Sequence, residues 1–289
     1  MENENAYDVK SKRLLSKKSI LCNIMKECIP EYKNLTKEEI MDCIEDGDVN
    51  SEYIKGINTE NINDNDSRIN YDVLFTSKLP NSNERIGMYI DLETQNIINP
   101  GYHLIDRAIY YSSRLIDMQK GSVFTGSNYS DIRKVYSIWI CTNPSNNQKD
   151  CINYYYIQED CLKGNYHTSN DYKKINIIML YIGDNYNYNL KGILEMLSLL
   201  FKNASIHTSS VVNKLDDDYD IILEEQEVVS MSNLSQGLIQ QGYQQGRLSN
   251  LIDCVKNLNS NGYSFDDAFK LLKVNDDIKQ EVLAKLKEQ

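Results

Sequence analysis

Residues 68–95, RINYDVLFTSKLPNSNERIGMYIDLETQ, contain two strand-like segments on either side of a turn-forming loop, and they constrain the fold more than any other part of the chain. The loop at 80–83 reads PNSN, and these residue types favour tight turns, so we expect an antiparallel hairpin. If the chain turns midway between Ser82 and Asn83, the numbers of opposed residues sum to 165. Asp72 then lies opposite Glu93 on the neighbouring strand.

This register separates an apolar face of the hairpin from a polar one, because successive side chains of a strand point to opposite sides. The apolar face carries Val73, Phe75, Ile90 and Leu92. The polar face carries Asp72, Asp91, Glu93 and Gln95. A soluble domain normally uses such positions for packing, so this group of carboxyl and amide side chains indicates either a binding site or a solvated surface. Asp91 lies opposite the apolar Leu74, and we expect it to be a supporting or surface acid.

The rest of the chain up to about residue 205 alternates between helical and strand patterns, which predicts an α/β core with a mixed sheet flanked by helices. Apolar residues at helical spacing indicate helices over 10–29, from Gly101 to about Lys120, and over 189–202. Thr36 and Glu39 form a capping box that opens a further helix over 37–45. Strands are expected over 134–142, 152–158 and 174–182. The tyrosines of NYYYIQ, residues 153–158, are expected to pack within their strand.

The composition changes after about residue 203, which divides the chain into three predicted parts. We expect a core domain over 1–205, an acidic and polar linker with the start of a helix over 206–232, and a helical region over 233–289. Gln–Gly pairs begin at 236, 241 and 245. Each glycine weakens a helix by roughly 1 kcal/mol, so their repetition favours either close helix contact or a flexible joint. This tail is therefore predicted to form a homodimer.

Charge and cysteine usage exclude several classes of protein. The chain has 31 basic and 42 acidic residues and a net charge of −11, so only a local basic patch could attract nucleic acid. The clearest patch, or alternatively a solvated helix face, consists of Lys12, Arg13, Lys17 and Lys18. Seven cysteines without a CxxC pair and three histidines lack zinc-site spacing. With no signal core and no apolar span, we expect a cytoplasmic protein with reduced thiols and no membrane partner.

The opposed acids Asp72 and Glu93 have the residue types and the spacing for a divalent cation. Directly opposed residues lie about 5 Å apart, and Gln95 follows Glu93 by roughly 6.6 Å along the strand. Mg²⁺ prefers carboxylate and carbonyl oxygens and usually keeps waters and substrate phosphates as its other ligands. Such an ion can polarise a phosphodiester and lower the pKa of an attacking water. The pattern therefore allows a Mg²⁺ site that could serve phosphodiester chemistry, and Mn²⁺ is expected to substitute for Mg²⁺ there.

An Asp followed about twenty residues later by Glu-x-Gln resembles the PD-(D/E)XK nuclease superfamily, with Gln in place of the usual Lys. The chain is also similar to the Rpn family of recombination-promoting nucleases, described as PD-(D/E)XK nuclease family transposases. The similar segments are EYKNLTKEEI, IKGINTEN, RINYDVLF, YIDLETQ, PGYHLIDRAIYYSSRLI and KVYSIWIC. The resemblance covers about residues 10–200. It implies a restriction-endonuclease-like core and a Mg²⁺-dependent DNA endonuclease without an organic cofactor, linked to recombination or mobile elements.

The resemblance also implies roles for individual residues. Asp72 and Glu93 would hold the metal, and Gln95 stands where the superfamily's catalytic Lys would be. An amide can donate to a phosphate or orient water, but it supplies neither positive charge nor a base. Glu31 matches a family acid that would complete the site. On the helix after the hairpin, the candidates for phosphate contact with DNA are Arg107, Tyr110 and Arg114.

Simpler interpretations stay open beside these. Arg107 and Arg114 can pair with Asp106 and Asp117 on their own helix, in exposed ion pairs that contribute little. The exchange of Lys for Gln95 also fits a catalytically weak or inactive nucleic-acid-binding or assembly module of a mobile element. A third alternative is a structural partner protein with neither DNA affinity nor metal binding.

Overall fold

The computed structural model describes residues 2–45, 52, 54, 60–63, 66–80, 88–95, 100–169, 172–183, 189–203 and 206–287. The chain divides into two compact units, Met1–Ser235 and Gln236–Gln289. Each unit is described by itself. Among the described residues, no helix is both long enough and apolar enough to span a bilayer.

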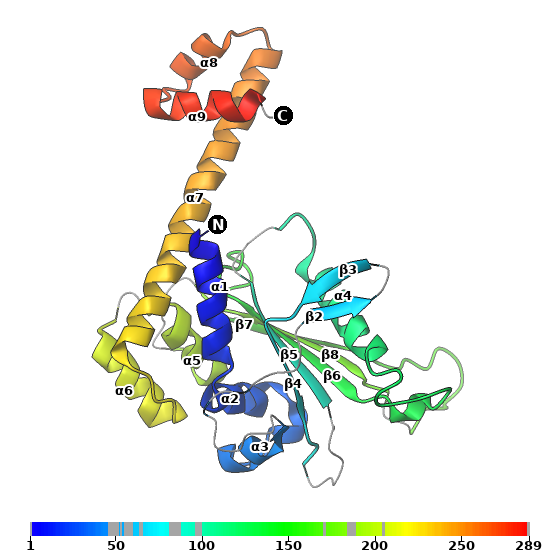
Figure 1. Cartoon of the computed structure of the whole chain (residues 1–289). Coiled ribbons are helices and arrows are strands. Elements are labelled where there is room, and N and C mark those ends of the chain that lie inside the picture. Colours follow the sequence, from blue (N-terminus) through cyan, green and yellow to red (C-terminus); the bar gives the residue numbers. More distant parts are fainter. Residues whose placement is uncertain are drawn as a thin grey trace. The chain divides into compact units, whose positions relative to one another are not determined.

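A six-stranded mixed sheet forms the centre of the first unit (Figure 1). Its spatial order is β1 (Ile44–Glu45), β4 (Val73–Ser77), β5 (Met88–Gln95), β6 (Lys134–Cys141), β8 (Ile175–Tyr181) and β7 (Cys151–Tyr156). β5, β6 and β8 are parallel, and the other neighbouring pairs are antiparallel. A separate antiparallel pair consists of β2 (Glu60–Asn63) and β3 (Asp66–Asn70). The predicted α/β architecture with a mixed sheet is confirmed.

The hairpin of β4 and β5 has the predicted register. Leu74 pairs with Asp91 and Phe75 with Ile90, so the opposed residue numbers sum to 165. The polar face is not a solvated surface, however, because helix α4 (Leu104–Asp117) packs over it. Ala108 and Leu115 of α4 are fully buried against this side of the sheet. Asp91 and Glu93 are therefore enclosed between the strands and this helix.

The opposite face of the sheet is also buried. Ile90, Leu92 and Ile138 on this face have no exposed surface. Helices α2 (Lys18–Cys28) and α5 (Gly192–Phe201) contact each other on this side, away from α4 (Figure 1). A sheet covered on both faces is typical of parallel strands with near-continuous apolar sequences, as β6 and β8 have.

The predicted helix over 10–29 is instead two helices, α1 (Glu2–Leu15) and α2, separated at Ser16 and Lys17. The break has a tertiary cause. The backbone N–H of Lys18 donates to the carbonyl of Glu52, and that of Ile54 donates to the carbonyl of Ser16. These long-range bonds replace helical ones at the junction. The next helix, α3 (Lys37–Cys43), has the predicted capping box of Thr36 and Glu39.

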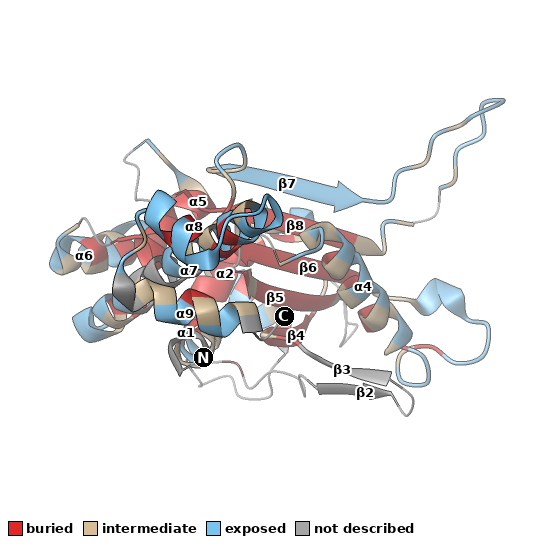
Figure 2. Ribbon diagram, turned by 90° about the horizontal axis from the view of Figure 1, so that it is seen from above, coloured by how far each residue is buried: buried red, intermediate tan, exposed pale blue. Residues whose placement is uncertain are grey.

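Strand β7 differs from the expectation that its tyrosines pack within the sheet. It lies at the edge, and all six of its residues are exposed (Figure 2). Tyr154 donates a hydrogen bond to Asn176 Oδ1 at 2.7 Å, while Tyr155 lies on the same face as α4. An edge strand has a neighbour on one side only, so its aromatic rings remain accessible to a ligand.

The first part of the predicted acidic and polar linker, residues 206–232, contains a helix, α6 (Thr208–Tyr219), whose C-terminal half is acidic. Val211, Leu215 and Tyr219 of α6 are buried in the first unit. α6 ends at Asp220, which has the left-handed φ of 53°. The 36-residue α7 (Glu225–Ser260) follows and crosses the boundary between the two units. In the second unit α7 packs with α8 (Phe265–Leu271) and α9 (Asp276–Lys287), and its core contains Ile252, Val255, Ala268, Phe269 and Val282.

Candidate functional site

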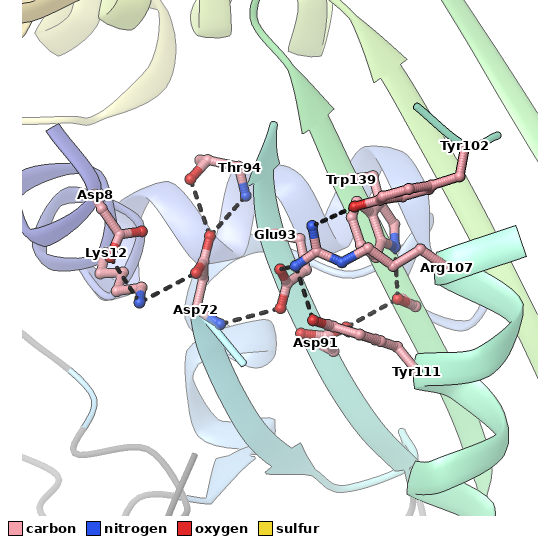
Figure 3. A network of polar contacts seen from close by, with 11 residues as sticks. Asp8, Lys12, Asp72, Asp91, Glu93, Thr94, Tyr102, Arg107, Tyr111 and Trp139 are labelled. Carbon is pink, nitrogen blue, oxygen red and sulfur yellow. Dashed lines mark hydrogen bonds and ion pairs between the residues drawn. The ribbon is translucent and has the colours of Figure 1, made fainter. Parts of the chain in front are cut away.

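The acidic residues of the hairpin gather where β5 passes beneath α4 (Figure 3). Asp91, Glu93 and Gln95 alternate along β5 and are 0%, 2% and 8% exposed. Asp72 directly precedes β4 and its side chain is 10% exposed. Carboxyl groups this deeply buried are rare in proteins unless they are paired or bind a cation.

Asp72 and Glu93 are neighbours, as predicted, but their carboxylates have different partners. The backbone N–H of Asp72 donates to Glu93 Oε1 at 3.1 Å. The Asp72 carboxylate turns the other way, and its Oδ2 accepts from Thr94 N at 2.8 Å and Thr94 Oγ1 at 2.9 Å. Its Oδ1 lies 3.3 Å from Lys12 Nζ on α1. The fold thus brings Asp72 next to Glu93, as expected from the hairpin. It also brings Lys12 to Asp72, which the sequence of the hairpin did not reveal.

Arg107 of α4 supplies the cation beside Glu93. Its Nη2 lies 3.7 Å from Glu93 Oε2 and donates to Tyr111 Oη at 2.8 Å. The guanidinium also lies over two aromatic rings, 4.8 Å from the centre of Tyr111 and 5.2 Å from that of Trp139. Stacking and hydrogen bonding fix its orientation towards the acids. The alternative pairing of Arg107 with Asp106 is not found in this structure.

Asp91 is more deeply embedded than a surface acid. Trp139 Nε1 donates to Ser137 Oγ at 2.8 Å, and Ser137 Oγ donates to Asp91 Oδ2 at 2.9 Å. The other oxygen, Oδ1, is buried and accepts no hydrogen bond from the described residues. Asp91 and Glu93 lie two residues apart on the same face of β5, and the charge of Asp91 acts on its neighbour Glu93.

The environment disfavours the ionised form of all three acids. Burial, opposed by the bond from Ser137, raises the pKa of Asp91 to about 7, and the charge of Asp72 adds to the rise. Burial, and then the charges of Asp91 and Asp72, raise the pKa of Glu93 well above its ordinary value. Burial also raises the pKa of Asp72, against the bonds from Thr94 and the charge of Lys12. Strongly perturbed acids in one cluster are a signature of functional sites.

The cluster has more carboxyl groups than cations. Asp8 lies 2.9 Å from Lys12 Nζ, so that Asp8 and Asp72 share one lysine, while Arg107 is the cation beside Asp91 and Glu93. This excess of negative groups, with a buried acceptor on Asp91, fits a divalent cation with oxygen ligands. Among the described residues, no three His, Cys, Asp or Glu side chains are already arranged to hold a metal ion.

Gln95 is the last residue of β5, two positions beyond Glu93 on the same face. Its backbone oxygen accepts from Thr142 N at 2.9 Å. The residue lines a pocket of about 260 Å³ at the carboxyl ends of the parallel strands. Its amide is thus placed between the acidic cluster and a cavity, where a bound phosphate or water could contact both.

Glu31 does not join the site, which corrects the expectation that it completes the metal ligands. It lies in the short helix η1 (Pro30–Tyr32), where its carboxylate accepts from Lys134 Nζ at 2.7 Å and Tyr136 Oη at 2.6 Å. Both partners are on the face of β6 opposite to α4. Burial opposes ionisation, but these two bonds lower the pKa of Glu31 below its ordinary value. Glu31 is thus held as a carboxylate in a separate ion pair.

The three predicted phosphate contacts have different surroundings. Arg107 contacts Glu93, as described above. Arg114 Nη1 is 3.6 Å from Asp117 Oδ2, as the simpler interpretation expected. Tyr110 is 48% exposed and has no hydrogen bond to a described residue. The contacts of Lys12 and Thr94 with Asp72 were not predicted from the sequence. The one signal for Lys12 was its place in the basic patch of Lys12, Arg13, Lys17 and Lys18.

Comparison with known proteins adds no identification: no protein-family model matches the chain, and no curated protein or solved structure matches it. The interpretation therefore depends on the site itself and on the sequence segments quoted above.

Proposed function

We propose that this chain is a metal-dependent nuclease that hydrolyses phosphodiester bonds of DNA, built on a restriction-endonuclease-like core. The observation that carries the proposal is the buried acidic cluster on the β4–β5 hairpin, in which Asp72 and Glu93 occupy opposed positions. Three carboxyl groups with raised pKa values lie next to one another there. Such a cluster lowers the stability of the fold in the absence of a ligand, which is a cost that binding of a cation would offset.

Asp72 and Glu93 would hold the metal, Mg²⁺ or in its place Mn²⁺. When bound, the ion would neutralise developing negative charge and lower the pKa of a water molecule. Hydrolysis adds that water across a phosphorus–oxygen bond. The protein groups beside the acids determine where the phosphate lies and which charges it meets.

Lys12 and Arg107 provide positive charge at the two ends of the cluster. Lys12 Nζ contacts Asp72 Oδ1 at 3.3 Å, and Arg107 Nη2 lies 3.7 Å from Glu93 Oε2. When the carboxylates bind a cation, the Lys12 and Arg107 side chains can turn to a phosphate oxygen instead. Ammonium and guanidinium groups bind phosphate as well as carboxylate. Lys12 thereby supplies the charge that Gln95, an amide, cannot supply. Gln95 itself would donate to the phosphate or orient the water.

Plasmid cleavage tests the proposal. Purified protein is expected to nick or cut supercoiled plasmid in Mg²⁺, and Asp72→Asn and Glu93→Gln are expected to abolish cutting. A matched control is Asp131→Asn, because Asp131 is exposed in the short helix η2 (Tyr129–Asp131) and lies outside the cluster. Equal cutting by the parent chain and both site variants would remove the cluster from catalysis.

A second function has its own support: a catalytically weak or inactive module that binds nucleic acid or assembles a complex. It is favoured by the ion pairs of Lys12 with Asp72 and of Arg107 with Glu93, since both predicted metal ligands already have cationic partners within the chain. DNA binding without cleavage in any divalent cation would establish this module. A protein with neither DNA affinity nor ion binding would instead be a structural partner.

The resemblance described above would link this activity to DNA recombination or to a mobile element, and we propose that the protein acts in the cytoplasm. Self-association through the C-terminal helices is part of the same proposal. Light scattering on the full chain tests it, and a monomeric mass would argue against the dimer.

A further inference from the structure

The pocket beside Gln95 has a defined position in the sheet. Gln95, Cys141 and Tyr181 are the last residues of β5, β6 and β8, and they lie in register across the three parallel strands. All three line the pocket. Ligands of open α/β sheets bind outside the carboxyl ends of parallel strands. The cavity therefore occupies the edge of this sheet where a ligand is expected.

Three tyrosines are among the residues that line the pocket. Tyr102 precedes α4 and is 48% exposed, and Tyr155 of the edge strand β7 is 38% exposed. Tyr181, at the end of β8, is buried. Side-chain amides accompany the rings: Gln95, Asn143 and Gln148 line the same cavity. Gln148 accepts from Ser145 through its Oε1, and no described residue accepts from its Nε2, which can therefore donate to a ligand.

We propose that this pocket binds one unpaired nucleobase of a DNA strand whose phosphate lies at the acidic cluster, so that the substrate is single-stranded or locally opened DNA. The proposal rests on the proposed function and names the form of its substrate. Aromatic rings stack on base faces, and amides pair with the donors and acceptors of base edges.

The size of the pocket favours a single base. Drug-sized ligands usually occupy cavities of roughly 300–1,000 Å³. A cavity of about 260 Å³ suits a smaller planar group and excludes a base pair. A duplex exposes only base edges in its grooves, so a tyrosine-lined pocket can engage a base face only after the base leaves the stack.

The pocket lies next to the acidic cluster along β5. Gln95 lies two residues beyond Glu93, roughly 7 Å along the strand. Arg107 connects the two sites, because its Nη1 lies 3.5 Å from Tyr102 Oη and its Nη2 lies 3.7 Å from Glu93. A net charge of −11 means that phosphate attraction alone does not hold DNA on this protein, so contacts to bases must contribute to affinity.

Fluorescence anisotropy in EDTA tests base binding apart from cleavage. The probes are a short labelled single strand, its duplex with the complementary strand, and an abasic strand of the same length. The single strand is expected to bind more tightly than the other two. Tyr102→Ala and Tyr155→Ala are each expected to weaken this binding by about 5- to 100-fold, the range for loss of one base–aromatic stack.

Two further variants separate stacking from a loss of folding. Tyr155→Phe keeps the ring and should retain the affinity. Tyr129→Ala removes a tyrosine that is 61% exposed and outside the pocket, and it should leave binding unchanged. Equal affinity for the abasic strand, or full affinity in Tyr155→Ala, would overturn the base pocket.

Cleavage in Mg²⁺ is then measured separately on the same set of proteins. Tyrosine-dependent binding of the single strand without any cleavage would retain the pocket and refute the nuclease. Cleavage of duplex DNA at the parent rate by both alanine variants would retain the nuclease and refute the pocket.

Discussion

Replacing Asp91 with Asn is expected to stabilise the first compact unit at alkaline pH. The Asp91 carboxyl has no exposed surface, and its Oδ1 accepts no hydrogen bond from the described residues. An Asn side chain has nearly the same shape. Its oxygen can accept the bond from Ser137 that Asp91 Oδ2 now accepts, and its uncharged amide replaces the buried carboxyl. Asn thus reproduces the protonated acid at every pH.

The magnitude follows from the pKa of the buried acid. Burial raises the pKa of Asp91 from 3.8 to about 7, which corresponds to about 4 kcal/mol at 1.36 kcal/mol for each tenfold change in proton affinity. Between these two pKa values the folded state binds more protons than the unfolded state, so stability falls as pH rises. The cost of ionisation is absent below about pH 4 and complete above about pH 7. Asp91→Asn should therefore match the parent near pH 4 and exceed it by up to about 4 kcal/mol at pH 8.5.

Urea unfolding followed by tryptophan fluorescence provides the assay. Trp139 is the single tryptophan of the chain, is fully buried, and lies in the first unit. A gain of about 4 kcal/mol would also raise the unfolding temperature of a unit of this size by roughly 8–16 °C. Asp131→Asn, at an exposed acid, should change neither value. If Asp91→Asn were less stable than the parent at pH 8.5, or kept the parent's pH dependence, the assigned cost of burying this carboxyl would be wrong.

Other perturbations address the metal, the lysine and a helix end. Mn²⁺ is expected to raise the unfolding temperature of the parent but not of Asp72→Asn or Glu93→Gln, because an ion that binds only the folded protein stabilises the fold by mass action. Scanning fluorimetry measures the unfolding temperatures. An equal rise in all three proteins would contradict metal binding at Asp72 and Glu93. Lys12→Met should lower the cleavage rate by roughly 100-fold, as expected for loss of one group that stabilises transition-state charge, and Lys12→Arg should retain more activity. The exposed Lys33→Met is the control, and equal loss in both Met variants would refute a specific role for Lys12. Thr36→Ala removes the side-chain half of the capping box of α3 and should cost about 1 kcal/mol in urea unfolding, whereas an unchanged midpoint would show that the cap contributes nothing.

The hairpin could be predicted because its determinants are local. A strand has a side-chain period of two, and a turn loop defines the centre of the pairing, so the position of Asp91 opposite Leu74 followed by arithmetic. The capping box at Thr36 is local in the same way, since both partners lie within one turn of α3. Features of this kind are determined by neighbours in the sequence, and the structure has them as expected.

Features that depend on distant contacts could not be predicted. The break between α1 and α2 is made by backbone bonds from Ser16 and Lys18 to residues 52 and 54, which no helical periodicity reveals. Glu31 follows the second helix in sequence, yet Lys134 and Tyr136 hold it on the far face of the sheet. A motif gives the order of residues along the chain, whereas the face that each residue reaches depends on packing.

The positions of Lys12 and Arg107 beside the acids are the clearest example of contacts that the sequence does not reveal. Lys12 comes from α1 and Arg107 from α4, 95 positions apart in the sequence, and the two reach opposite ends of one acidic cluster. A fold selected for stability alone would place apolar side chains on this part of β5, as it does with Ala108, Trp139 and Met179 nearby. Instead the chain buries three carboxyl groups and surrounds them with two cations, a threonine and a serine. Such groups lower stability when their charges are not balanced, so their concentration on β5 supports the charged ligand that we propose for this site.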